Sequence, residues 1–398
     1  MASLRHFAAR ENARKESPLE EQNAERRGRN SGIDVLRGLS IIFVVLHHTN
    51  LHMGFNHVSF AGMLPKPLAR ILFWNGANGV IVFFAISGFL ITSNALRRWG
   101  VLQRVRLADF YRMRLARIAP LLLTLLLVLS GLHMAHARGF TISPAQTNLP
   151  RALLAAVTFH INWLESARGY LPASWDVLWS LSVEEMFYLF FPLLCIVTRK
   201  PKVLAVTLMG FVLAGPFARV LYGESLWAEY GYFSCVDAIA LGCLAAMVAP
   251  HVPQRDAVLR WLAITGTALM LLVTVGMRTW NLRQICPPLY SWQLDNTALA
   301  LGTSLTLIAL SRRNRAGRWI SAPLRWFGRN SYEVYLTHMF VVTWSIQLFV
   351  ARGLSVAWAP LAYLAMLGLA GGLGAVVAQW YSEPLNRFLR RSRQLAGL

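Results

Sequence analysis

The sequence has few charged side chains and few cysteines for its length. Only 14% of its 398 residues are charged, against about 25% in typical soluble domains, and this scarcity excludes an ordinary water-soluble globular protein. Its cysteines are too few and too scattered to indicate a disulfide framework or a paired zinc motif; they are Cys195, Cys235, Cys243 and Cys286. The sequence therefore predicts no structural metal.

Acidic residues are scarce as well, with 18 Asp and Glu against 39 Lys and Arg, which gives a net charge of +21. Such a charge suggests nucleic-acid binding. However, 56% of the residues are apolar, and apolar stretches long enough to cross a bilayer recur along the chain. We therefore attribute the positive charge to membrane orientation and to contacts with lipid headgroups, and expect no nucleic-acid partner.

The hydropathy pattern predicts an all-α membrane protein built as a bundle of about ten transmembrane helices. We expect a disordered cytoplasmic tail at 1–30, one transmembrane domain at 31–386 and a basic cytoplasmic C-terminal tail at 387–398. The first thirty residues contain no apolar core of the length that a signal peptide needs. The expected spans are 33–53, 77–96, 115–133, 178–198, 202–221, 232–250, 260–277, 292–310, 330–350 and 357–378.

The distribution of basic residues predicts the orientation of these spans. With the N-terminus inside, 30 of the 39 Lys and Arg residues fall in cytoplasmic segments, as the positive-inside rule requires. Both termini should therefore be cytoplasmic. The stretch 150–165 is apolar but short, and a crossing there would place every later basic loop outside. We interpret it as an extracytoplasmic interfacial or re-entrant helix.

Ionisable residues inside predicted spans are functional candidates, because they are costly in lipid. In the first span, Asp34 and Arg37 share a helix face at the inner edge, where they can pair. His48 lies eleven residues beyond Arg37, or about 16 Å along the helix, near the middle of the membrane. Imidazole can accept and return a proton near neutral pH. The alternatives are a structural histidine bonded to a backbone carbonyl and a metal site that pairs His48 with His52.

Two arginines stand just before the third span. Arg114 and Arg117 are three residues apart, so both guanidinium groups face one direction, an arrangement suited to gripping phosphates. Arginines at the cytoplasmic end of a helix also anchor it in the membrane whatever the protein does. Pattern alone leaves both interpretations open.

The segment at 179–192 opens the fourth span from the outer side. Ser182 and Glu185 have the spacing of a helix N-terminal capping box, and this leaves Glu184 without a structural explanation. Glu184 lies beside Trp179, and Asp237 opens the sixth span on the same outer side. Together they suggest an acidic, aromatic outer mouth suited to sugar hydroxyls, opposite a basic inner mouth suited to a phosphorylated cofactor. His338 adds a second intramembrane histidine.

Several motifs follow one another in register from residue 33 to residue 384. They are Asp34-Val-Leu-Arg37-Gly38 followed by His48, Gly79-Val80 with Phe83 to Leu90, Arg114-Leu-Ala-Arg117-Ile-Ala-Pro120, Trp179 to Tyr188, Ser331-Tyr332 with Tyr335-Leu336 and His338, and Glu383-Pro384. In this order and spacing the chain resembles the acyltransferase-3 family of integral-membrane acyltransferases. Three positions depart from the family pattern: Met186 replaces a usual glutamine, and Ile81 and His47 replace residues that are often polar and small, respectively.

The resemblance implies ten membrane helices, an acyl-CoA donor, often acetyl-CoA, reached from the cytoplasm, and a hydroxyl acceptor, commonly a sugar of an extracytoplasmic glycan. It implies that His48 is catalytic and that Arg37, Arg114 and Arg117 hold the donor. We assign Glu184 and Glu185 to catalysis on the acceptor side. We assign Trp179, Asp237 and His338 to substrate binding.

The predicted protein is thus an O-acyltransferase of the bacterial cytoplasmic (inner) membrane that needs no metal. His48 would act either as a general base toward the acceptor hydroxyl or as a transient carrier of the acyl group. The alternative is a transporter or flippase for a lipid-linked sugar or acyl compound, in which the same groups would relay protons.

Overall fold

The structure, a computed structural model, describes residues 30–277, 287, 291–313 and 319–395, with side chains through residue 390. Within these ranges it is helical and contains no strand. The predicted tail at 1–30 lies outside the described residues except for Asn30. That residue caps the first helix, because its side-chain oxygen accepts the backbone N–H groups of Gly32 and Ile33.

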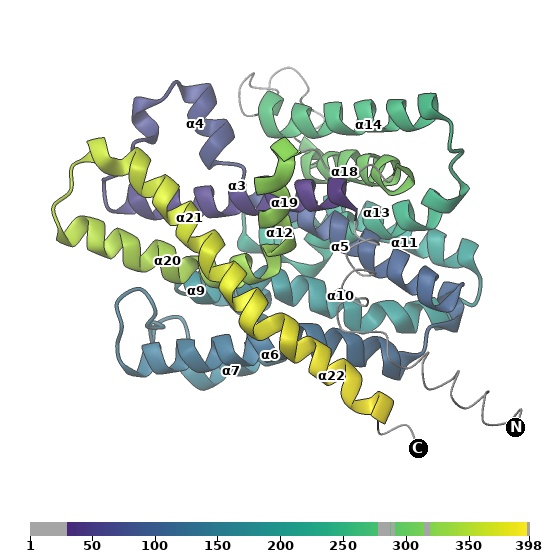
Figure 1. Ribbon diagram of the computed structural model, residues 1–398, viewed down its shortest axis with the longest axis horizontal. Helices are drawn as coiled ribbons and strands as arrows, with labels where there is room; N and C mark the ends of the chain where they lie inside the picture. The colour runs from purple at the N-terminus through teal and green to yellow at the C-terminus, as the bar shows by residue number, and fades with distance from the viewer. Residues whose placement is uncertain (1–29, 278–286, 288–290, 314–318, 396–398) are drawn as a thin grey trace, which may run out of the picture.

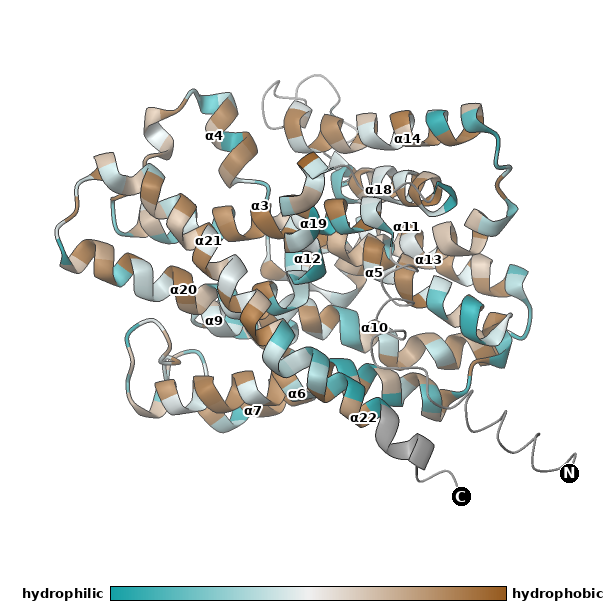
Figure 2. Cartoon of the chain, viewed as in Figure 1, coloured by the Kyte–Doolittle hydropathy of each residue, from teal (hydrophilic) through white to brown (hydrophobic). Residues whose placement is uncertain are grey.

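Nine helical segments of the described residues are long and apolar enough to cross a membrane, and they correspond to nine of the ten predicted spans. Figure 2 shows the hydropathy of their residues along the cartoon, with hydrophobic residues in brown. They are α3 (Ser31–Phe55), α5 (Gly76–Trp99), α6 (Leu107–Met134), α9 with α10 (Ala173–Asp176 and Leu178–Val197), α11 (Pro201–Tyr222), α12 with α13 (Leu226–Tyr230 and Tyr232–Val248), α14 (Asp256–Leu271), α20 (Ser331–Ala351), and α21 (Ala359–Val377) continued by α22 (Glu383–Leu395).

The tenth predicted span, 292–310, corresponds to α18 (Asp295–Arg312), which is not among the nine. This helix packs against α5, α13 and α14 and carries polar side chains on buried positions. Thr303 and Thr306 donate their hydroxyls to carbonyls one turn back, at 2.8 and 2.9 Å. Because neighbouring helices surround it, α18 needs less hydropathy than a helix that faces lipid.

The short apolar stretch at 150–165 forms two helices, α7 (Leu149–Val157) and α8 (Ile161–Arg168), and neither is long enough to cross a membrane. The chain turns between them at Phe159, which has a φ of 57°. Two further short helices were not predicted: α4 (Lys66–Phe73) and α19 (Ala322–Arg329).

Several long helices, among them α3, α6, α10 and α14, run in roughly the same direction, and α21 continued by α22 crosses the view obliquely (Figure 1). A π-helical turn at Ala378–Ser382 joins α21 to α22. The predicted C-terminal tail at 387–398 is helical as far as Leu395. Hydrophilic residues gather along α22 (Figure 2).

Glycines allow two pairs of helices to approach closely. A Cβ at Gly38 of α3 would lie 1.9 Å from the Leu324 carbonyl oxygen of α19, and a Cβ at Gly328 would lie 1.8 Å from the Asp34 carbonyl oxygen. The same holds for Gly88 of α5 and Gly242 of α13. Small residues at helix contacts are a common basis of packing in membranes. The contact between α3 and α19 places Arg37 close to the basic residues of α19.

Gly88→Ala should lower the apparent melting temperature of the purified protein, because the new methyl group would lie 2.0 Å from the Ile239 carbonyl oxygen. Overpacking of this kind typically costs about 1–3 kcal/mol. Gly210→Ala is the matched control, since nothing lies within 4 Å of its Cβ position in α11 and alanine favours the helix. Equal melting temperatures for the two variants would contradict close packing of α5 on α13.

Candidate active site

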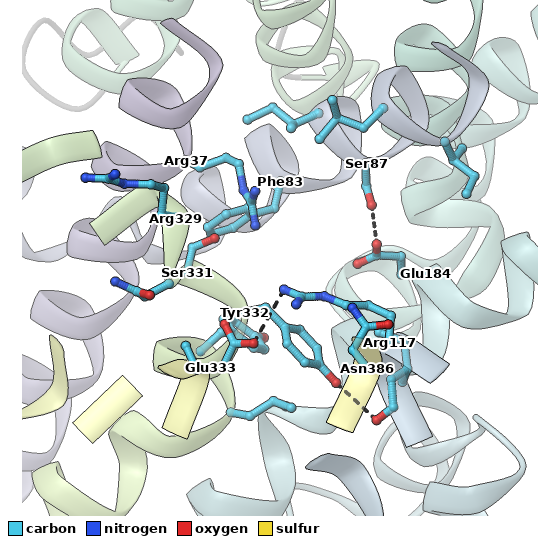
Figure 3. A pocket seen from close by; sticks show the side chains of 18 of the residues that line it. Arg37, Phe83, Ser87, Arg117, Glu184, Arg329, Ser331, Tyr332, Glu333 and Asn386 are labelled. Carbon is cyan, nitrogen blue, oxygen red and sulfur yellow. Dashed lines mark hydrogen bonds and ion pairs between the residues drawn. The ribbon is translucent and has the colours of Figure 1, made fainter. Parts of the chain in front are cut away.

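A cavity of about 1380 Å³ opens among α3, α5, α6, α10, α19, α20, α21 and α22. Nine arginines and four acidic residues are among the described residues that line it, so its lining carries a net positive charge. The arginines are Arg37, Arg98, Arg112, Arg114, Arg117, Arg325, Arg329, Arg387 and Arg390. All three arginines predicted to hold the donor are therefore brought together in one cavity, which Figure 3 shows from close by.

Arg114 links α6 to α10. Its guanidinium donates a hydrogen bond to Glu185, lies 3.7 Å from Glu184, and stacks over the Tyr188 ring with its carbon 3.9 Å from the ring centroid. The Glu185 side chain is buried, so this pair neutralises a carboxylate that lipid and protein would otherwise leave unpaired. Arg114 thus has a structural role in addition to any contact with a phosphate.

This contact corrects two predictions. The predicted capping box is wrong, because α10 begins at Leu178 and places Ser182 inside the helix, where its hydroxyl donates to the Leu178 carbonyl. The predicted separation of Glu184 and Glu185 from the basic inner mouth is also wrong. Glu184 lies about 16 Å along the helix from Ala173, and Arg114 lies about 10 Å along α6 from Leu107. Both lengths together are smaller than the thickness of the membrane core, about 30 Å, so the two groups meet inside it.

Arg117 links α6 to α20. Its guanidinium lies 3.4 Å from a carboxylate oxygen of Glu333, which is only 1% exposed, and its carbon lies 5.1 Å from the centroid of the Tyr332 ring. Figure 3 shows Arg117 and Glu333 reaching toward each other, with Asn386 beside Arg117. Arg117 itself remains 27% exposed, so it keeps N–H groups that a bound anion can reach.

A network of hydroxyl groups, which sequence reasoning did not single out, lines the cavity beside Arg114. Ser87 donates its hydroxyl to Glu184, which also accepts the Tyr188 hydroxyl at 2.9 Å. Ser87 and Tyr188 lie within the motifs of the family resemblance, but neither is charged at neutral pH, so neither stands out within an apolar segment of the sequence.

Phe83 and Tyr335 line the cavity, and their ring centroids are 6.5 Å apart. Ser180 holds the Tyr335 hydroxyl at 2.6 Å. The next ring beyond Tyr335 is that of His338, with centroids 6.0 Å apart, and His338 in turn lies 5.1 Å from His48. His48 does not line the cavity itself. The ring of His338 lies between it and Tyr335 of the cavity lining.

The two histidines form a hydrogen-bonded pair between α3 and α20. Nδ1 of His338 lies 2.7 Å from the Tyr335 carbonyl oxygen, and its Nε2 lies 3.3 Å from Nδ1 of His48. The same Nδ1 of His48 lies 3.0 Å from the Val44 carbonyl oxygen. His338 is fully buried, whereas His48 keeps some exposed surface.

These contacts assign the neutral tautomers. A carbonyl oxygen only accepts, so His338 carries its proton on Nδ1, and its Nε2 is an acceptor. Nδ1 of His48 faces two acceptors, the Val44 oxygen and Nε2 of His338, and must therefore carry the proton of that ring. The lone pair of His48 is then on Nε2. A histidine oriented in this way can take up a proton or attack a carbonyl carbon through Nε2.

Two predicted substrate-binding residues lie away from the cavity lining. Trp179 is 7% exposed and stacks on Tyr230 with centroids 4.2 Å apart. Asp237 is fully buried in an ion pair with Arg219 at 2.9 Å, and Thr297 donates to the same carboxylate at 2.5 Å. This pair joins α11, α13 and α18, which is sufficient to explain a buried carboxylate there.

His52 packs its ring on Phe55, and no three metal-binding side chains are grouped within the described residues.

Comparison with known proteins identifies the family. A family model described as an acyltransferase domain matches residues 30–380. The chain belongs to the acyltransferase-3 family.

Relatives within this family carry names of O-acetyltransferases. The chain is 27% identical over 337 residues to the peptidoglycan O-acetyltransferase OatA of Listeria monocytogenes, covering 78% of this chain and 49% of the relative. It is 24% identical over 343 residues to the O-acetyltransferase OatA of Staphylococcus aureus, covering 78% and 50%. The chain thus spans about half the length of these relatives. No solved structure is significantly similar to it.

Proposed function

We propose that this acyltransferase-3 protein moves an acyl group, normally acetyl, from cytoplasmic acyl-CoA to a hydroxyl of an extracytoplasmic or lipid-linked glycan. The observation that carries the proposal is the continuity of the site: a cavity lined by nine arginines is also lined by Tyr335, whose ring contacts that of His338, the hydrogen-bond partner of His48. The names of the relatives support acetyl as the group and a cell-wall saccharide as the acceptor class.

The cavity suits the donor because CoA carries several phosphate groups and arginine binds phosphate through paired N–H donors. Arg37, Arg114 and Arg117 would hold the phosphates together with the arginines of α19 and α22. The thioester arm would then extend toward Phe83 and Tyr335. Movement of these two rings would bring the thioester to His48.

Nε2 of His48 would act on the acyl group in one of two ways. As a general base it takes the proton of the acceptor hydroxyl, whose oxygen attacks the thioester carbonyl. The carbon–sulfur bond then breaks, the proton passes to the leaving thiolate, and the products are an O-acyl ester and CoA thiol. As a carrier, Nε2 itself attacks the thioester carbonyl, the carbon–sulfur bond breaks, and the acylated ring gives its Nδ1 proton to the leaving thiolate. The acceptor hydroxyl then takes the acyl group from Nε2, and its proton returns to the ring.

The orientation in the membrane completes the proposal. The basic mouth of the cavity would face the cytoplasm of a bacterium, with both termini on that side of the inner membrane, in agreement with the positive-inside rule. Lipid would surround the bundle. His48 lies 17 residues beyond Ser31 of α3, or about 25 Å along the helix, so the reaction would occur toward the outer half of the membrane.

Sided membrane vesicles test this proposal. Acetyl-CoA labelled in its acetyl group does not cross membranes, so label should enter glycan in inverted vesicles and not in intact right-side-out vesicles. Permeabilising the right-side-out vesicles should restore the transfer. Equal transfer in intact vesicles of both orientations would contradict the proposed donor side, and uptake of a saccharide without acetylation would favour a carrier.

A further inference from the structure

We propose that a second cavity, at the opposite end of α6 from the donor cavity, binds a saccharide that carries an anionic group. The inference rests on the proposed function, because it identifies where the acceptor would be recognised. The cavity has a volume of about 670 Å³ and lies among the end of α6, the loop that follows, α7 and α8.

Its position fits an acceptor on the far side of the membrane. The donor cavity reaches Ile118 of α6, whereas the second cavity begins at His133 of the same helix. These residues are fifteen positions apart, or about 22 Å along the helix. Because α6 is long and apolar enough to cross a membrane, the two cavities would face opposite membrane surfaces.

Its lining is rich in hydrogen-bond donors. Arg151 and Arg168 line it, and no Asp or Glu is among its described lining residues. Asn148 also lines it, and its side-chain oxygen accepts the backbone N–H of Arg151 at 2.9 Å, so its NH₂ group remains a donor. Nδ1 of His133 accepts the Ile142 backbone N–H at 3.0 Å, so the proton of the neutral ring is on Nε2.

An exposed aromatic side chain completes the site. Trp163 of α8 lines the cavity and is 56% exposed, while the edge of Trp227 supports it at a centroid distance of 6.0 Å. A rigid, amphipathic ring beside polar groups gives a large contact area at low conformational cost. An indole face beside donors is suited to a sugar ring, and the guanidinium groups are suited to a carboxylate or phosphate on it.

The walls of the cavity are held in place by contacts outside it. The loop after α6 is fixed where the buried Phe140 stacks on Phe340 at 5.5 Å and where Gln347 donates to the Arg138 carbonyl at 2.7 Å. Arg151 donates to Nε2 of His160 at 2.6 Å. Burial and the charge of Arg151 lower the pKa of His160, so His160 remains a neutral acceptor for Arg151 near pH 7. A preorganised site of this kind loses little entropy on binding.

The site can be tested by binding, independently of catalysis, with the full-length protein in nanodiscs. The probes are the disaccharide of N-acetylglucosamine and N-acetylmuramic acid, which carries a carboxylate, a short-chain prenyl-pyrophosphoryl N-acetylglucosamine, which carries phosphate, and neutral di-N-acetylchitobiose. We expect the protein to bind at least one anionic probe more tightly than the neutral one. Whichever anionic probe binds more tightly identifies the source of the charge.

Two variants and their matched controls locate the binding. Trp163→Ala and Arg168→Gln should each weaken binding of the preferred anionic probe by about 10-fold or more, the effect of losing about 1.4 kcal/mol. Trp358→Ala and Arg352→Gln should leave it unchanged, because Trp358 is 57% exposed and Arg352 is also exposed, and neither lines the cavity. Arg168→Gln should also remove the preference for the anionic probe.

Three results would overturn the inference: wild-type protein with no preference for either anionic probe, unchanged binding in both cavity variants, or equal weakening by Trp358→Ala. The last would mean that the tryptophans act only as anchors at the membrane surface. Since acetyl transfer is not needed for these measurements, failure of the site is distinguishable from failure of the proposed reaction.

Discussion

His48→Gln should lower acetyl transfer at least about 100-fold, the low end of what general base catalysis contributes, while membrane insertion and protein level stay normal. The amide can still donate to the Val44 carbonyl, which Nδ1 of His48 approaches at 3.0 Å, so a purely structural histidine would tolerate the change. An amide neither accepts a proton near neutral pH nor attacks a thioester. The measurement is transfer of labelled acetyl from acetyl-CoA to glycan by equal amounts of each protein.

Two companion variants separate the roles of the histidines. His52→Gln, one turn further along α3, should be nearly normal, and a loss equal to that of His48→Gln would favour the metal-site alternative. His338→Leu removes the acceptor that faces Nδ1 of His48 at 3.3 Å. It should lower transfer and change its pH profile, and His338→Gln, which restores an acceptor, should recover part of the loss. Near-normal transfer by His48→Gln would contradict the catalytic assignment.

Arg117→Gln should destabilise the protein and abolish transfer. It leaves the Glu333 carboxylate, 1% exposed, without the guanidinium that lies 3.4 Å away, and loss of one partner of a buried pair costs about 3–5 kcal/mol. The double variant Arg117→Gln with Glu333→Gln removes both charges and should recover most of the protein level and melting temperature.

The double variant then distinguishes anchoring from donor binding. If Arg117 also binds a phosphate of the donor, the KM for acetyl-CoA should remain raised by about 10-fold or more, since one charge-assisted contact contributes about 1.5–3 kcal/mol. Glu333→Gln alone is the control, because it keeps the guanidinium. A normal KM in the stable double variant would mean that Arg117 only joins α6 to α20.

The sequence was sufficient to predict most of the helices, because each span is a long apolar run that can be recognised without knowing which helices pack against it. It also predicted α18 at 292–310, although this helix is not among the nine membrane-span candidates and packs against α5, α13 and α14. It missed α19, a short helix whose position depends on the absence of side chains at Gly38 and Gly328. Contacts of this kind join residues almost 300 positions apart and leave no local pattern.

The residues of the site could likewise be predicted only in part. Arg37, Arg114 and Arg117 could be found from sequence because guanidinium groups stand out within or beside apolar segments. Their partners could not: Arg114 meets Glu185, and Arg117 meets Glu333, only because helices from distant parts of the chain cross there. Asp237 also stood out, but its partner Arg219 is on another helix, so sequence could not separate a buried ion pair from a binding group.

The most direct test of the account is a double-label experiment with purified protein in nanodiscs. Acetyl-CoA labelled differently in its acetyl group and in CoA is added with a saccharide acceptor. The account predicts that acetyl label appears as an ester on the saccharide while an equal amount of labelled CoA is released as free thiol, and that neither occurs with His48→Gln. Release of no CoA by wild-type protein, or equal transfer by His48→Gln, would contradict it.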